Sequence, residues 1–161
     1  MLRWRSYVRQ HNCVPVKAHS NKERVINEQS IVRVLVVEDF ADWRGYIAEK
    51  LREIRYLTVI HFATDGLAAV RQAAELKPDL ILMDIGLPSL NGIAAGRQIR
   101  KLVPDSKIIF VTAETSASVA EEALSLGAAG YVLKTAVDCD LLDAVEAVMS
   151  GKRFVSQNLS D

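Results

Sequence analysis

The sequence predicts an α/β fold in which five parallel strands form one doubly wound sheet with helices on both faces. After residue 30, short runs rich in Val, Ile and Leu alternate with longer stretches whose apolar residues recur at helical spacing. Nearly continuous apolar runs are typical of strands that are buried on both faces. Because the crossover between two parallel strands is right-handed, strict alternation of strand and helix places helices on both sides of the sheet.

Each element in the first half of this pattern has its own signal. The first strand is the β-branched run IVRVLVV, and the apolar residues of the following helix form one stripe. Pro78 ends the second helix, after which the buried run LILMD gives the third strand. The expected elements are a strand at Ile31–Val37, a helix carrying Trp43, Ile47, Leu51 and Ile54, a strand at Leu57–Ala63, a helix at Gly66–Leu76 and a strand at Leu80–Asp84.

The second half continues the alternation. A loop is expected at Leu87-Pro88, because a residue before proline avoids the helical conformation. Ser118 and Glu121 have the spacing of a capping box, and a glycine follows each of the last two helices. The expected elements are a helix at Gly92–Leu102, a strand at Ile108–Thr112, a helix at Ser118–Leu126, a strand at Gly130–Leu133 and a helix at Asp140–Ser150.

Charge and composition divide the chain into three parts. Residues 1–30 hold six Lys/Arg against two Asp/Glu without a sustained hydrophobic period, which predicts a mobile basic extension. Residues 31–152 form the expected globular domain, and residues 153–161 a C-terminal tail. The residues after position 30 hold fourteen Lys/Arg against eighteen Asp/Glu. This acidic balance argues against nucleic acid as the main partner, because DNA affinity depends largely on Lys and Arg.

The sequence also indicates where the protein works. No apolar stretch approaches the roughly 20 residues that span a bilayer. Residues 1–20 lack the apolar centre of a signal peptide, because Arg and Lys residues are scattered through them. We therefore expect a cytoplasmic protein without a membrane partner.

Charged and hydroxyl side chains follow four of the predicted strands. Glu38 and Asp39 come after the first strand, Asp84 ends the third, Thr112 ends the fourth, and Lys134 follows the fifth. The carboxyl ends of parallel strands open onto a common crevice. Two carboxylates about 4 Å apart repel each other by about 4 kcal/mol at an effective dielectric constant near 20. A divalent cation relieves this repulsion, and Mg²⁺ is favoured because few protein ligands, waters and a phosphate oxygen suit its octahedral geometry.

Such a site has a definite chemistry. A carboxylate beside a metal ion can attack phosphorus, and the product is an aspartyl phosphate. Lys134 would balance the charge of the transferred group. The hydroxyl of Thr112 and the backbone N–H of Ala113 are available as donors to phosphoryl oxygens.

The same residues resemble the receiver domain of response regulators in two-component signal transduction, from residue 31 to about residue 150. The resemblance implies a flavodoxin-like (βα)5 fold with strand order 2-1-3-4-5. GAAGYVLK and the tail GKRFVS resemble receivers that precede a helix-turn-helix output domain, but the sequence stops at Asp161, so no DNA-binding domain is expected in this chain. The matching stretches are Glu38-Asp39, DIGLPSLNG at 84–92, Thr112-Ala113 and YVLK at 131–134.

The resemblance also implies roles and partners. The phosphoryl donor is a phosphohistidine on a sensor histidine kinase or a phosphotransfer protein, and small acyl phosphates can substitute. The chain is expected to be a phosphoacceptor signalling protein and not an enzyme. The implied site residues are Asp84 as phosphoacceptor, Glu38, Asp39, Asp84 and the carbonyl of Gly86 as Mg²⁺ ligands, Lys134 as phosphoryl partner, and Thr112 with Tyr131 as the switch pair.

Phosphorylation is expected to change one face of the domain. An acyl phosphate adds about two negative charges, which draw Thr112 and Lys134 toward Asp84. By analogy with the family, Tyr131 then turns inward. The surface formed by the helix at 118–126, the strand at 130–133 and the helix at 140–150 becomes the readout. We expect it to bind a downstream protein or a second copy of the chain.

Three other functions stay open. A phosphatase of the haloacid dehalogenase type also forms an aspartyl phosphate, but it needs an Asp two residues after the nucleophile, where this chain has Gly86. A flavodoxin-like cofactor binder needs a phosphate-cradling loop after the first strand, where Glu38 and Asp39 would repel phosphate. The third is an adaptor of the receiver fold without phosphorylation, which the presence of every charged position argues against.

Overall fold

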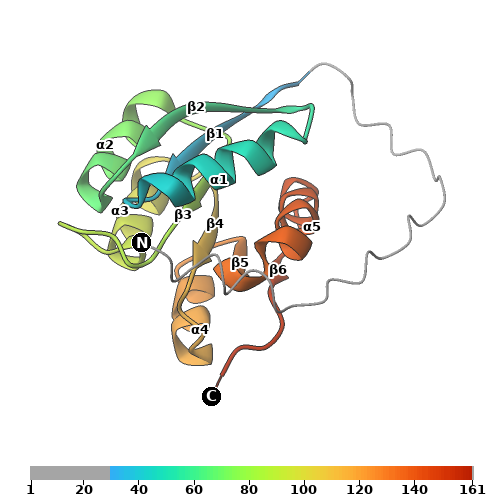
Figure 1. Ribbon diagram of the computed structural model, residues 1–161. Helices are drawn as coiled ribbons and strands as arrows, with labels where there is room; N and C mark the ends of the chain where they lie inside the picture. Colours follow the sequence, from blue (N-terminus) through green and yellow to red (C-terminus); the bar gives the residue numbers. More distant parts are fainter. Residues whose placement is uncertain (1–29, 161) are drawn as a thin grey trace.

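The structure is a computed structural model that describes residues 30–160, so the predicted mobile extension lies outside the described residues except for Ser30. Over the described range, five α-helices surround a parallel sheet of six strands in the order β2-β1-β3-β4-β5-β6 (Figure 1). None of these helices combines the length and the apolar character needed to cross a membrane. The elements are β1 (Val32–Val37), α1 (Ala41–Arg52), β2 (Leu57–Ala63), α2 (Gly66–Leu76), β3 (Leu80–Met83), α3 (Gly92–Leu102), β4 (Lys107–Thr112), α4 (Ala117–Ser125), β5 (Gly130–Leu133), a 3-10 helix (Lys134–Ala136), α5 (Val137–Met149) and β6 (Phe154–Val155).

The two faces of the sheet carry separate hydrophobic cores. Alternate residues of β1 show this directly, because Leu35 and Val37 face one core while Val34 and Val36 face the other. Helices α2, α3 and α4 pack on the first face, and α1 and α5 pack on the second. The four central strands β1, β3, β4 and β5 are therefore covered on both sides, as their continuous apolar runs predict.

The register of the sheet brings the strand ends together at one edge. Val37 pairs with Ala63 of β2 and with Met83 of β3. On the other side, Thr112 at the end of β4 pairs with Leu133 at the end of β5. The residues that follow these strands consequently enter the same region of space.

Most element boundaries agree with the sequence prediction. The expected ranges of β2, α2, α3 and β5 are those observed. Asp84 lies one residue beyond β3, and its backbone N–H still donates to the carbonyl of Val37 in β1 at 3.0 Å. Helix α5 begins at Val137, three residues earlier than predicted, because the chain enters it directly from the 3-10 helix that carries Lys134.

The predicted start of α4 is wrong. The helix begins at Ala117 with Ser116 as its N-cap residue, so the expected capping box at Ser118 does not form. Two contacts from outside the helix hold this start: the carboxylate of Glu114 accepts from the Ser116 N–H at 3.0 Å, and the carbonyl of Ser160 accepts from the Ala117 N–H at 2.8 Å. A contact from the tail therefore supplies part of the capping.

The predicted five-strand order is observed, and the C-terminal tail adds a sixth strand to it. Strand β6 pairs in parallel with β5, so β5 is not an edge strand. The buried hydroxyl of Ser156 accepts from the Leu133 N–H at 3.0 Å and donates to the Asp140 carboxylate. Further along, Ser160 forms an isolated bridge with Ser116. The tail is thus bonded to β5, to α5 and to the loop before α4.

Gly92 is expected to tolerate no side chain. A Cβ at this position would lie 2.1 Å from the carbonyl oxygen of Asp84 and 2.8 Å from Cα of Ile85. Gly92→Ala should lower the free energy of unfolding by about 1–3 kcal/mol, because backbone must move. Gly45 lies within α1, where an added methyl group would meet no heavy atom within 4 Å. Gly45→Ala should therefore raise the free energy of unfolding by about 0.5–1 kcal/mol. Urea unfolding of both variants measures the difference, and a Gly92→Ala protein as stable as wild type contradicts the close packing.

Loss of the Ser156 hydroxyl should destabilise the sheet. Ser156→Ala leaves the Leu133 N–H and the Asp140 carboxylate each without one partner, and we expect a loss of about 1–3 kcal/mol. The matched control is Ser125→Ala, which removes an exposed hydroxyl at the end of α4 and should change stability by less than about 0.5 kcal/mol. Equal urea midpoints for the two variants would show that the hydrogen bonds of the Ser156 hydroxyl add nothing to stability.

Candidate functional site

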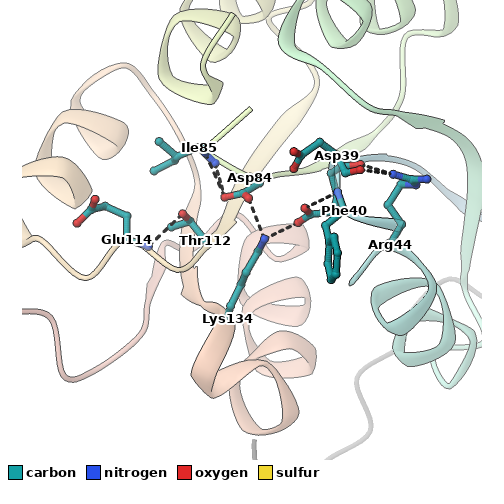
Figure 2. Close-up of polar contacts among 10 residues, drawn as sticks. Asp39, Phe40, Arg44, Asp84, Ile85, Thr112, Glu114 and Lys134 are labelled. Atoms are coloured by element: carbon teal, nitrogen blue, oxygen red, sulfur yellow. Dashed lines mark hydrogen bonds and ion pairs between the residues drawn. The ribbon is translucent and has the colours of Figure 1, made fainter. Parts of the chain in front are cut away.

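Three carboxylates from two neighbouring strands meet at the carboxyl edge of the sheet (Figure 2). Glu38 and Asp39 follow β1, and Asp84 follows β3, which pairs with β1. One carboxylate oxygen of each residue lies within 4.8 Å of the others. Glu38 and Asp84 are buried and Asp39 is exposed, so the cluster is open to solvent on one side. An all-oxygen donor set of this kind suits a hard divalent cation.

Lys134 reaches this cluster from the end of β5, which β4 separates from β3 in the sheet. Its ammonium nitrogen lies 2.6 Å from Oε2 of Glu38 and 2.8 Å from Oδ2 of Asp84. The side chain starts at the first residue of the 3-10 helix after β5. Charge-assisted contacts of this length are among the stronger hydrogen bonds in proteins. The lysine therefore offsets part of the repulsion between the two buried acids.

The two buried acids are held differently. Burial raises the pKa of Glu38 above its ordinary value; the hydrogen bond and charge of Lys134 oppose that rise, and the charge of Asp84 adds to it. Asp84 has both oxygens engaged: Oδ1 accepts from the N–H groups of Ile85 at 2.7 Å and Gly86 at 3.3 Å, while Oδ2 accepts from Lys134. Its carboxylate is accordingly fixed in orientation.

Arg44 orders the acidic loop and was not identified from the sequence. Its Nη1 donates to the carbonyl oxygens of Glu38 at 2.9 Å and Asp39 at 2.8 Å (Figure 2). The N–H of Phe40 donates to Oε1 of Glu38 at 3.1 Å. An arginine in the first half of an amphipathic helix looks like any solvated charge in the sequence, so no signal pointed to this role.

The predicted switch residues are connected through Glu114. Thr112 is buried at the end of β4, and its hydroxyl oxygen accepts from the Glu114 N–H at 3.2 Å. Tyr131 is fully buried, and its hydroxyl donates to the Glu114 carbonyl at 2.9 Å. Burial raises the pKa of Tyr131 to about 12, with the charges of Glu114 and Asp84 adding to the rise. The Tyr131 ring is thus turned inward, and a change of its orientation on phosphorylation stays a prediction.

The roles of two backbone groups in the predicted site stay predictions. Gly86 and Ala113 lie directly after Ile85 and Thr112, in the loops that border the acids. Gly86 contacts Asp84 through its N–H. Metal binding by the Gly86 carbonyl and phosphoryl binding by the Ala113 N–H are not tested by these contacts.

The sequence shows what this arrangement is similar to. Residues 34–146 match a family described as the response regulator receiver domain. Response regulator GacA of Pseudomonas viridiflava is 35% identical over 130 residues, which cover 81% of this chain and 61% of that protein. The chain thus spans about three fifths of the length of this curated relative. A protein-glutamate methylesterase/protein-glutamine glutaminase of Maricaulis maris is 43% identical over 107 residues, covering 65% of this chain and 27% of that protein.

A solved structure agrees with this result. A two-component response regulator of the LuxR family from Aurantimonas sp. SI85-9A1 superposes with a TM-score of 0.77 at 31% identity, covering 81% of this chain and 93% of that chain. The family match extends from β1 into α5 and includes every residue of the acidic cluster. The chain therefore belongs to the family of response regulator receiver domains.

Proposed function

We propose that this receiver accepts a phosphoryl group on Asp84 with the help of Mg²⁺ and reports it through a change of its surface. The observation that carries the proposal is the position of the Asp84 carboxylate. It lies beside two further acids and within 2.8 Å of the Lys134 ammonium. Together these groups offer a nucleophile and the positive charge that a transferred phosphoryl group requires.

The acidic cluster fits Mg²⁺. Glu38, Asp39 and Asp84 offer oxygen ligands close enough to share one ion, and the carbonyl of Gly86 is the further ligand that we propose. When bound, the ion supplies positive charge to the phosphoryl oxygens. The raised pKa of Glu38 is consistent with a carboxylate that gains from a nearby cation.

The reaction proposed for Asp84 is a direct phosphoryl transfer. A carboxylate oxygen forms a bond to phosphorus while the P–N bond of a phosphohistidine, or the P–O bond of a small acyl phosphate, breaks. The leaving group keeps the bonding electrons. The N–H groups of Ile85 and Gly86 hold the carboxylate in place, and Lys134 supplies charge to the transferred group.

The signal leaves the site along the hydrogen bonds of Glu114. If Thr112 turns its hydroxyl toward the phosphoryl group, the bond to the Glu114 N–H is lost, and the Glu114 carbonyl that holds Tyr131 is free to move. The next residue, Thr115, is bonded to Ser160 of the tail. The readout surface that we propose is therefore formed by α4, α5 and the tail over β5, and not by an exposed β5 edge.

The proposed partners follow from this cycle. A sensor histidine kinase or a phosphotransfer protein supplies the phosphoryl group in the cytoplasm, and a downstream protein or a second copy of the chain receives the signal. Apart from its own phosphorylation and dephosphorylation, we propose no enzymatic activity. The likeness to the methylesterase covers 27% of that protein, so it gives no reason to expect esterase chemistry here.

Phosphorylation should depend on Asp84 and on Mg²⁺. Incubation with acetyl phosphate and Mg²⁺ should add one phosphoryl group to the intact mass, and omission of the metal should abolish the gain. Asp84→Asn removes the nucleophile and should show no gain. Asp105→Asn, an exposed turn residue, is the matched control and should behave as wild type. A metal-dependent gain that survives in Asp84→Asn contradicts the proposal.

Loading of Asp84 should loosen the loop after β4. With beryllofluoride and Mg²⁺ as a phosphoryl mimic, amide exchange in residues 112–118 should become faster, because the Glu114 N–H loses its bond to Thr112. Exchange in residues 154–160 should also change, because the Ser160 N–H is bonded to Thr115. Hydrogen exchange with mass spectrometry measures both segments.

Helix α2 and the Asp84→Asn variant are the controls for this experiment, and both should be unaffected. Unchanged exchange in residues 112–118 of a fully loaded protein contradicts the proposed route. Sedimentation of the same samples distinguishes the two proposed outputs. Binding of a second copy of the chain raises the sedimenting mass, whereas a surface that binds a different protein leaves the mass of the pure sample unchanged.

A further inference from the structure

The ammonium group of Lys134 has a third neighbour that the phosphotransfer scheme leaves unused. The indole ring of Trp43 lies beside it, with the ring centroid 5.3 Å from the ammonium nitrogen. This separation is within the roughly 6 Å over which a cation is attracted to the face of an aromatic ring. Trp43 belongs to the first turn of α1 and is 7% exposed, so the contact is largely shielded from water.

The indole ring is itself fixed by neighbours. Tyr46 packs against it with the two ring centroids 5.0 Å apart, and the Tyr46 hydroxyl donates to the Asp138 carboxylate. Lys50 binds the same carboxylate at 2.8 Å and lies over the Tyr46 ring. Asp138 lies four residues after Lys134, in the first turn of α5. The segment that carries the lysine is therefore tied to α1 through Asp138, which binds both Tyr46 and Lys50.

The three neighbours of the lysine differ in what happens to them during the proposed reaction. Glu38 and Asp84 are also the proposed metal ligands, so a bound ion would compete with Lys134 for their carboxylate oxygens. The face of Trp43 binds neither Mg²⁺ nor phosphate. Of these three neighbours, the indole is the one that neither a metal ion nor a phosphoryl group would draw away from the lysine.

We propose that Trp43 is a positioning residue that keeps the Lys134 ammonium at the mouth of the site for the phosphoryl group. The proposal rests on the proposed function of Asp84 and deepens it. Without the indole ring, a lysine displaced from Glu38 and Asp84 by the metal would have no neighbour to keep its ammonium group out of solvent. The effect should fall on the rate of phosphoryl transfer and not on the binding of the metal, which Lys134 opposes.

Trp43→Leu and Trp43→Phe test this role. A cation held against an aromatic face is stabilised by about 0.5–2 kcal/mol, so Trp43→Leu should slow phosphorylation by acetyl phosphate at saturating Mg²⁺ by about 2- to 30-fold. Its affinity for Mg²⁺ should be unchanged or higher. Trp43→Phe keeps an aromatic face and should recover most of the rate. Intact mass against time gives the rate, and a metal titration followed by NMR gives the affinity.

Ile47→Val is the matched control for lost core packing. Ile47 is buried one turn further along the same helix and packs in the same core. This variant should lose about 0.5–1.5 kcal/mol of stability and phosphorylate at the wild-type rate. A slow Ile47→Val protein would show that loosening of α1 is sufficient, and it would overturn a specific role for the indole.

A second measurement needs neither metal nor phosphorylation. In the metal-free wild type, the ring current of the indole should move the Lys134 ε-methylene NMR signal upfield of the ordinary lysine range, and Trp43→Leu or Trp43→Phe should reduce the shift. The signal is assigned by its absence from Lys134→Gln. An ordinary lysine shift in the folded wild type overturns the proposal even if Trp43→Leu does not fold.

The outcomes for the two proposals are distinguishable. If the wild type gains no phosphoryl group, the proposed function fails, while the metal-free lysine signal still decides whether the indole holds Lys134. If the wild type is phosphorylated and Trp43→Leu is phosphorylated equally fast, the function stands and the positioning role is overturned.

Discussion

The contact of one lysine with two buried acids is the interaction on which the rest of the site depends. Like charges at the ends of neighbouring strands repel, and burial adds a desolvation cost for each ionised carboxylate. Lys134 offsets both the repulsion and the desolvation cost of the Glu38 and Asp84 carboxylates. Because the lysine arrives from β5 and the acids from β1 and β3, this balance exists only when the central strands are assembled in one sheet.

The contacts of Lys134 with the two acids depend on the charges around them, so an added charge at this site changes their strength. The same acids that hold the lysine form the cluster that could hold a metal ion, so a bound cation would compete with Lys134 for their carboxylate oxygens. The neighbouring loop is tied by single hydrogen bonds through Glu114 to Thr112 and Tyr131. The tail binds the same loop, because the Ser160 N–H donates to the Thr115 carbonyl and the Ser160 carbonyl accepts from the Ala117 N–H. A local change of charge therefore has a short covalent and hydrogen-bonded route to the surface.

The agreement between predicted and observed elements has a local cause. Strand β2 and helices α2 and α3 have the predicted bounds because apolar periodicity and the flanking Gly and Pro residues are read over a few neighbouring positions. The start of α4 was predicted wrongly because Ser160, far along the chain, binds the first helical N–H. Strand β6 was missed because two residues are too few to show a period.

The sequence by itself determined the order of the elements and the acids, hydroxyl and lysine that end the central strands. These depend on alternation along the chain and on the rule that parallel strands end at one edge. Tertiary structure alone decided what surrounds them: Arg44 on the loop carbonyls, Trp43 beside Lys134, and the tail over β5. The physical reason is that Trp43 meets Lys134 and the tail meets β5 from distant parts of the chain, and Arg44 binds backbone carbonyls that any sequence offers, so local periodicity carries no information about these contacts.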